Sequence, residues 1–421
     1  MTAAALISRC LLAGVLCTLA SVLFAPGANA APAAAAPALT PPARITPIAT
    51  APRIGVVTMA PGEVFFERFG HDAIVVAEPG LEPVSYNFGF FDPGEEDFVS
   101  NFARGRMMYW LVALPLAQDL QQYRAAGRGA TLQWLNLPPA QARQLADALA
   151  SRADSPQARY RYDYYQANCA TMVRDALDQA MGGHLQAQLA GRSAGNTWRS
   201  ESVRLARPAA WMWLGFDLLL GPAADRPLSR WEEAFVPMRL ADSLRLASNT
   251  QGQALVAEEV VLLPHQLPPE PAEAARRTWP WLLWGLALAG ALLASRQRPR
   301  LHGALAGGFW LATGLAGSLM AVLWLATEHT AGWANHNLLL CPPLALALLP
   351  AARRWWQQRQ PARWMWPLGL LVLACSGIAL LLYGLQVRPQ AHLGWIALLA
   401  PAHAVLAWQL RPGALRPSSL A

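Results

Sequence analysis

Two hydrophobic patterns divide the chain at about residue 275. Before that point, apolar residues occur in short runs that Pro, Gly and charged residues interrupt. After it, apolar residues form five long stretches, at 279–295, 305–327, 338–351, 364–385 and 393–410. A membrane-spanning helix needs about 20 such residues; two stretches approach that length and three are shorter. The pattern predicts an all-α transmembrane bundle of about five helices over residues 276–421. The third stretch contains Pro342-Pro343 and could instead be re-entrant.

The part before residue 275 has the pattern of a mixed α+β domain. Segments rich in β-branched and aromatic residues predict strands at 53–59, 71–77, 84–88, 106–114 and 130–137. Apolar residues at helical spacing predict helices at 138–153 and 169–181, the second ending at Gly182-Gly183. Residues 200–275 are rich in Pro and Trp, and their pattern assigns no element.

The N-terminal segment resembles an export signal. Arg9, an apolar run and the small residues Ala28-Asn29-Ala30 predict a signal peptide at 1–30, although an uncleaved anchor helix has the same pattern. Residues 31–52 are rich in Ala and Pro, which predicts a linker. The exported domain would then comprise residues 53–275.

Charge separates along the same boundary. The 421 residues carry a net charge of +7, and every basic residue is Arg. Residues 31–275 hold 20 Arg and 25 acidic residues, whereas residues 276–421 hold 12 Arg and one acidic residue, Glu328. The positive charge therefore belongs to the apolar region, which argues against a nucleic-acid partner.

The loops between the apolar stretches indicate an orientation. Nine Arg follow the first, third and fifth stretches, and only Arg388 follows the second or fourth. Under the positive-inside rule this asymmetry predicts a multi-pass protein of the bacterial inner membrane, with residues 31–275 outside the cytoplasm and a cytoplasmic C-terminus.

Of the five cysteines, only Cys169 falls in the exported domain, so it has no disulfide partner there. A lone exported thiol is a candidate nucleophile, although most free cysteines are simply buried apolar residues. Cys169 begins a predicted helix, and a helix N-terminus lowers the pKa of a thiol.

A thiol nucleophile needs an imidazole, and the exported domain contains His71, His184 and His265. His71 opens a predicted strand, whereas His184 and His265 lie in predicted loop sequence next to Gly or Pro. His71 is therefore the preferred general base. No His, Cys or Asp cluster has the spacing of metal ligands, and no glycine-rich phosphate loop is present, so no cofactor is expected.

These residues belong to an ordered set of motifs that resembles the Lnb N-terminal periplasmic domain family. The motifs are Phe69-Gly70-His71, Tyr86-Asn87-Phe88-Gly89, Tyr162-Asp163-Tyr164-Tyr165, Asn168-Cys169-Ala170-Thr171 and Arg174-Asp175. The resemblance covers about residues 55–245 and extends to Asn335-His336-Asn337 in the tail. The sequence departs from the family at Phe65-Phe66-Glu67.

The resemblance implies a papain-like thiol fold in permuted order, with the histidine before the cysteine. It implies transfer of an acyl chain within bacterial lipoproteins through a thioester on Cys169, with His71 as general base. Asn87 is the candidate third residue, although a strand-end structural role fits equally. Asn168 and Thr171 are candidates for substrate or oxyanion contacts. Membrane lipids and lipoproteins are the expected partners, and the sequence indicates no oligomeric state.

Two other functions remain open. The same thiol site fits a hydrolase, a peptidase or amidase acting on cell-wall peptides, because one fold serves several chemistries. Cys169 could also be structural, in a non-catalytic envelope scaffold. A polytopic membrane region favours a lipid substrate, since a cell-wall hydrolase does not need one.

Overall fold

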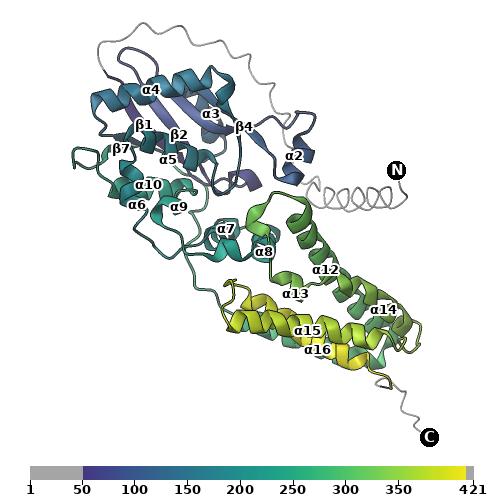
Figure 1. Cartoon of the computed structure of the whole chain (residues 1–421). Helices are drawn as coiled ribbons and strands as arrows, with labels where there is room; N and C mark the ends of the chain where they lie inside the picture. The colour runs from purple at the N-terminus through teal and green to yellow at the C-terminus, as the bar shows by residue number, and fades with distance from the viewer. Residues whose placement is uncertain (1–50, 414–421) are drawn as a thin grey trace. The chain divides into compact units, whose positions relative to one another are not determined.

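A computed structural model describes residues 51–413 of the chain (Figure 1). The predicted signal peptide and almost all of the predicted linker lie outside these residues. An antiparallel sheet of seven strands, in the order β6-β4-β3-β2-β1-β5-β7, forms the first part. The strands are β1 (Arg53–Met59), β2 (His71–Ala77), β3 (Val84–Phe90), β4 (Met108–Pro115), β5 (Ala130–Leu135), β6 (Arg159–Arg161) and β7 (Val256–Leu263).

The five predicted strands are confirmed, with small differences at their ends. The edge strands β6 and β7 were not predicted from the pattern. β6 has only three residues, and four of the eight residues of β7 are exposed, so neither carries the buried apolar run of a central strand.

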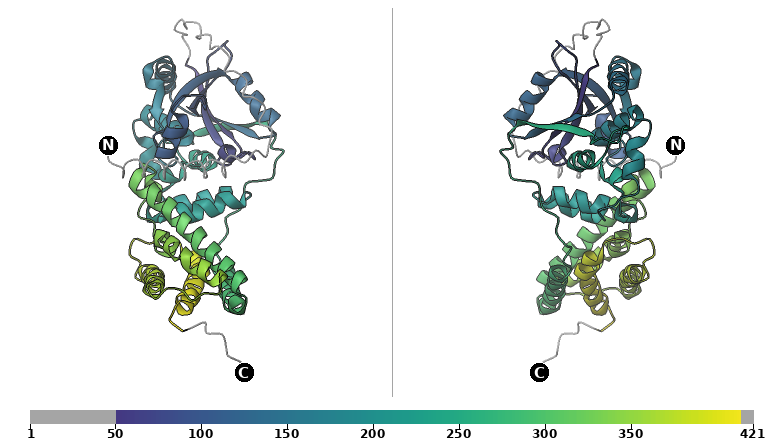
Figure 2. Two further views of the ribbon diagram at one scale, coloured as in Figure 1. Left: turned by 90° about the vertical axis from the view of Figure 1, so that its right-hand side faces the viewer. Right: turned by 90° about the vertical axis from the view of Figure 1, so that its left-hand side faces the viewer.

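Both faces of the central strands are buried, and this explains their continuous apolar sequence. Along β2, Ile74 and Val76 belong to the core cluster that includes α4 (Pro139–Ala153) and α5 (Cys169–Ala180). Ala73 and Val75 belong to a second cluster with α3 (Leu116–Ala125). Figure 2 shows helices on the two sides of the sheet. The domain is therefore α+β, as the sequence predicts.

Helices α4 and α5 confirm the two predicted helices. The other helices of this region were not predicted: α2 (Phe98–Arg104), α3, α6 (His184–Leu189), α7 (Trp198–Ala206), α8 (Ala210–Leu219), α9 (Arg230–Glu233) and α10 (Pro237–Leu246). Four of these helices lie between residues 198 and 246, so most of the segment that the pattern left unassigned is helical. Its prolines fall mainly at helix starts and in the connections, as at Pro237, the first residue of α10.

Arg199 holds this helical segment together. Its buried guanidinium pairs with Asp225 and donates to the carbonyls of Asp217, Leu220 and Gly221. Five donors of one side chain thus fix the connection that follows α8.

We expect Arg199→Met to lower the free energy of unfolding by about 3–5 kcal/mol, because it strands a buried carboxylate and several carbonyls. Thermal unfolding of the full chain in detergent measures this loss. Arg226→Met removes an exposed ion pair with Glu232 and should cost under about 1 kcal/mol. Equal loss in both variants would contradict this role of Arg199.

The second part is helical. It contains α11 (Trp279–Ala294), α12 (Pro299–Ala326), α13 (Asn337–Leu340), η6 (Pro343–Leu348), α14 (Leu349–Trp356), α15 (Met365–Gly384) and α16 (Leu393–Gln409). Three helical segments are long and apolar enough to cross a membrane: 299–326, 337–356 and 365–384. Helices α11 and α16, with 16 and 17 residues, are shorter. The structure therefore supports three candidate spans, and five spans remain a prediction.

The third apolar stretch is broken where the sequence places two prolines. α13 ends at Leu340, and the chain resumes as η6 at Pro343. The break packs closely on α12, where a Cβ on Gly317 would lie 1.5 Å from the carbonyl oxygen of Cys341. Only glycine fits at this contact.

Candidate active site

Cys169 is the first residue of α5, and Asn168 caps that helix. The Asn168 side-chain oxygen accepts the N–H of Thr171 at 2.9 Å, and Thr171 Oγ1 accepts the N–H of Asn168 at 2.8 Å. This reciprocal capping box fixes the backbone on both sides of Cys169.

The side chains of Asn168 and Thr171 are buried and fully engaged in the protein. Asn168 Nδ2 also donates to the carbonyls of Tyr164, at 2.9 Å, and Phe235, at 2.8 Å. The sequence interpretation assigned both residues to substrate or oxyanion contacts. Their polar side-chain atoms serve the helix cap and the Tyr164 and Phe235 carbonyls, so both residues help to position Cys169. Contact with substrate or oxyanion stays a prediction.

The sulfur of Cys169 lies against the start of β2. The backbone N–H groups of Asp72, Ala170 and Cys169 itself reach it and favour the thiolate. Burial has the larger effect, and with the nearby Asp72 carboxyl it raises the pKa of the thiol to about 12. The sequence predicted a lowered thiol pKa, and this is wrong for the free protein because desolvation outweighs the helix N-terminus.

His71 is the first residue of β2, directly before the Asp72 whose N–H reaches the sulfur. Its Nε2 lies 3.0 Å from Asn87 Oδ1. Helix α5 packs against β2 and β3, the strands that carry these two residues. The structure therefore brings Cys169, His71 and Asn87 into one neighbourhood.

A buried carboxylate fixes the orientation of Asn87. Asn87 Nδ2 donates to Asp119 Oδ2 and to Ser85 Oγ, each at 2.9 Å, and Ser85 Oγ donates to Asp119 at 2.6 Å. The amide oxygen must then face the imidazole, so Nε2 of His71 carries the proton and donates it. Nδ1 is left as the basic nitrogen.

The His71 imidazole is neutral and can therefore accept a proton. Burial lowers the pKa of His71 below its usual value, and Arg128 lowers it further. The Asn87 hydrogen bond and the Asp119 and Asp72 carboxylates act in the opposite direction. A neutral imidazole beside a neutral thiol is thus the resting state at neutral pH.

The sequence pattern did not identify Ser85, Asp119 or the role of Asp72 as parts of the site. Asp119 lies on α3, which was not predicted, and it meets Asn87 across 32 positions of sequence. Asp72 is completely buried, its Oδ1 accepts from Thr58, and burial raises its pKa to about 7. Its position directly after His71 was the only available signal.

The other two histidines lie elsewhere. His184 begins α6, beyond the far end of α5. His265 follows β7, and its Nδ1 accepts the N–H of Gly129 at 3.0 Å. Within residues 51–413, no group of three His, Cys, Asp or Glu side chains could hold a metal ion.

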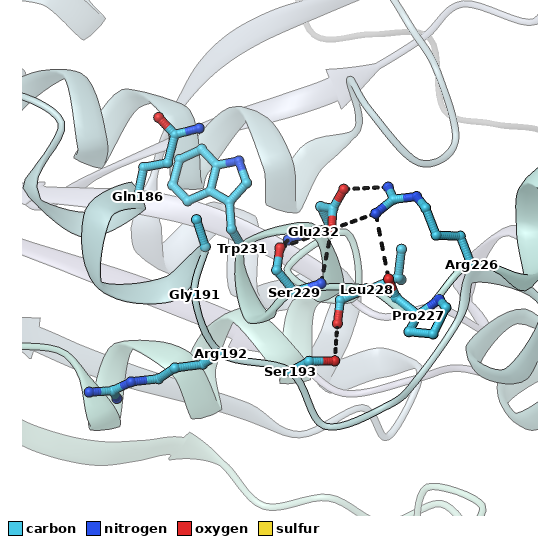
Figure 3. A pocket seen from close by; sticks show the side chains of 11 residues that line it. Gln186, Gly191, Arg192, Ser193, Arg226, Pro227, Leu228, Ser229, Trp231 and Glu232 are labelled. Atoms are coloured by element: carbon cyan, nitrogen blue, oxygen red, sulfur yellow. Dashed lines mark hydrogen bonds and ion pairs between the residues drawn. The ribbon is translucent and has the colours of Figure 1, made fainter.

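A surface hollow of about 530 Å³ lies apart from these residues, between α6 and α9 (Figure 3). Its wall contains Trp231 and an Arg226–Glu232 ion pair, and Glu232 also accepts from the Ser229 cap of α9. These polar contacts therefore join residues of the wall to one another and stabilise it. None of the predicted site residues lines this hollow.

Comparison with known families identifies both parts of the chain. The model of the Lnb N-terminal periplasmic domain matches residues 48–204, and the model of the Lnb transmembrane domain matches residues 278–406. The comparisons with curated proteins and with solved structures return no match. Two matched domains in order indicate a membrane protein with a periplasmic segment, and the chain belongs to the Lnb family.

Proposed function

We propose that the protein is a membrane-anchored cysteine acyltransferase that moves an acyl chain on bacterial lipoproteins at the periplasmic face. One observation carries this proposal. The only thiol of the described periplasmic part stands at a helix N-terminus beside a histidine that a buried amide–carboxylate chain orients. Nucleophilic catalysis by cysteine requires this arrangement.

In the first half-reaction, His71 Nδ1 takes the thiol proton while Cys169 Sγ attacks the ester carbonyl of the lipid-modified cysteine. The tetrahedral intermediate collapses, the C–O bond breaks, and the imidazolium protonates the departing glycerol oxygen. The acyl chain is then held as a thioester on Cys169. Because the thiol pKa is about 12, we propose that proton transfer accompanies attack, with no stable thiolate beforehand.

In the second half-reaction, the free α-amino group of the same lipoprotein attacks the thioester. An amide bond forms, the C–S bond breaks, and the amine proton passes through His71 back to the sulfur. The backbone N–H groups of Cys169 and Ala170 lack helical partners at the start of α5, and they would stabilise the oxyanion in both steps.

The proposal also includes the type of fold, the membrane topology and the partners. The order His71 before Cys169 fits a permuted papain-like thiol fold. Five spans, an inner-membrane location and a cytoplasmic C-terminus fit the distribution of Arg in the loops. Membrane lipids and lipoproteins would be the partners.

Trapping the thioester tests the first half-reaction. Full-length protein in detergent is mixed with a diacylated lipopeptide whose amino group is acetylated, so that the second half-reaction is blocked. We expect one hydroxylamine-sensitive acyl group on Cys169 in the mass spectrum. Release of free fatty acid without a trapped acyl group would indicate hydrolysis of the lipid ester in place of transfer. No acylation and no release at all would contradict the acyltransferase and favour the peptidase or amidase, which cell-wall peptides would then test.

Asp119 provides a test through pH. We expect Asp119→Asn to reduce kcat by roughly 10²-fold, because the Asn87 amide and hence His71 lose their fixed orientation. Asp119 raises the pKa of His71, so its removal lowers that pKa. In the pH–rate profile, the rate falls toward low pH as His71 becomes protonated. We expect this acidic limb of the profile to move to lower pH in the variant, because the pKa of His71 is lower.

The pH–rate profile of kcat/KM measures this shift. Asp147→Asn, which neutralises an exposed carboxylate on α4, is the matched control and should keep the wild-type limb. An acidic limb that stays in place in Asp119→Asn would mean that Asp119 does not act through His71.

A further inference from the structure

Exposed apolar side chains cluster on one edge of the periplasmic part. We call this surface the aromatic lip. It consists of Val64, Phe65, Phe66, Phe90, Val99 and Phe102, which are between 38% and 64% exposed. They come from η1 (Phe65–Glu67) and its preceding residue, the end of β3, and α2. Large apolar surfaces left in water mark sites of contact with another molecule or a membrane.

Stacked rings connect the lip with the interior. Phe66 meets Phe91 with ring centroids 6.3 Å apart, and Phe91 lies 5.1 Å from Tyr109. Tyr109 in turn stacks on Tyr162 at 4.2 Å. The lip and the buried tyrosines thus form one continuous aromatic wall.

This wall reaches Cys169. Desolvation raises the pKa of Tyr162, and the charge of a Cys169 thiolate adds to this effect because the two side chains are close. Phe90 directly follows Gly89, where a Cβ would lie 3.7 Å from that of Cys169. Residues of η1 lead within four positions into His71. The lip therefore borders Cys169, and η1 directly precedes the segment that leads to His71.

The other end of the wall meets the membrane region. Phe102, one of the two lip residues on α2, accepts through its carbonyl a hydrogen bond from His329 Nε2 at 3.1 Å. His329 lies three residues beyond Ala326, the last residue of the candidate span α12. The lip is therefore attached just beyond the end of that candidate span.

Several contacts keep this attachment in place. Glu328 pairs with Arg106 and Arg161, and its N–H donates to the Arg104 carbonyl at 2.8 Å. A Cβ on Gly105 would lie 3.0 Å from the Glu328 carbonyl carbon. The only acidic residue of the membrane region thus ties the end of α2 to the end of α12.

We propose that the aromatic lip binds the acyl chains of the membrane-embedded lipid substrate and leads one of them toward Cys169. This inference rests on the proposed acyl transfer. An acyl chain is the occupant that fits, because the surface is apolar, continuous with the catalytic neighbourhood, and attached at the end of a membrane span.

Photo-crosslinking tests the lip independently of catalysis. Full-length Cys169→Ala in nanodiscs receives a phospholipid and, separately, a diacylated lipopeptide, each with a diazirine in an acyl chain. We expect labelled peptides from η1 and α2 with the lipopeptide, besides those from the membrane helices. Because this variant cannot form a thioester, labelling is unaffected if the acyl-transfer proposal fails.

Matched variants sharpen the result. Phe65→Ser combined with Phe66→Ser should reduce labelling of α2 by about fivefold or more, since apolar contact area is lost. Leu81→Ser changes an equally exposed side chain in the turn after β2 and should leave labelling unchanged. Unaltered thermal unfolding checks that both variants fold. Labelling confined to residues 279–409, or equal in all variants, would overturn the proposal.

Discussion

Replacing Cys169 with alanine is expected to reduce acyl transfer by about 10³-fold or more. The substitution removes the only atom that can carry the thioester, and loss of a nucleophile typically leaves only binding and oxyanion stabilisation. Alanine suits the first turn of α5 and leaves the Asn168–Thr171 capping box intact. The rate is measured as N-acylated product from a diacylated lipopeptide with a free amino group.

Two further variants separate chemistry from structure. Cys169→Ser keeps the size of the side chain but is a much weaker nucleophile, so it should be nearly as inactive. Cys375→Ala removes a partly buried thiol on α15 and should retain wild-type activity. Full activity in Cys169→Ala would show that this thiol is structural and would support the scaffold alternative.

Replacement of His71 with alanine is expected to reduce kcat by about 10²- to 10⁴-fold, the usual contribution of a general base. The effect should be large here because burial holds the thiol pKa near 12, and a neutral thiol attacks poorly without proton removal. Raising the pH should partly restore the variant, since hydroxide then supplies the thiolate. Wild-type activity should instead decline only as pH falls through the lowered pKa of His71.

The matched control for this prediction is His184→Ala. His184 lies beyond the far end of α5, so its loss should leave both kcat and the pH profile unchanged. A His71→Ala variant with the wild-type pH profile would contradict the assignment of His71 as the base.

Local sequence was enough to predict the central elements of the periplasmic part. Strands β1, β2 and β5 have apolar side chains that enter two cores, whereas β3 alternates apolar and polar residues because its apolar side chains enter only one of them. Asn168 and the amphipathic repeat after it defined the start of α5, since a cap and a helical face are both local signals. Cys169 and His71 were found because few residues of their type lie in this part.

The features that sequence analysis did not predict depend on contacts between residues far apart in the chain. Asp119 acquires its role only when α3 packs under β3 and brings its carboxylate to Asn87. The raised thiol pKa likewise follows from burial by the whole domain, which a helix N-terminus does not reveal. Helix α7 is tied to the end of α8 and the connection after it through Arg199, whose partners lie 18 to 26 positions away. A periodic pattern of apolar residues does not predict such contacts of a single buried arginine.

The membrane region shows a similar limit. Its apolar stretches and the break at Pro342-Pro343 could be predicted from the sequence, because apolar composition and proline determine structure through local effects. Its attachment to α2 through Glu328 was not, although Glu328 was conspicuous as the single acidic residue of the tail.

The most direct test of acyl transfer through Cys169 is mass spectrometry of lipoprotein N-termini from cells that depend on this protein for N-acylation. Cells with the wild-type protein should contain N-acylated lipoproteins whose glycerol has lost one ester-linked chain, with the total number of chains unchanged. Cells with Cys169→Ala should contain only the diacylglyceryl form with a free amino group. N-acylated lipoproteins at wild-type levels in the Cys169→Ala cells would contradict the account.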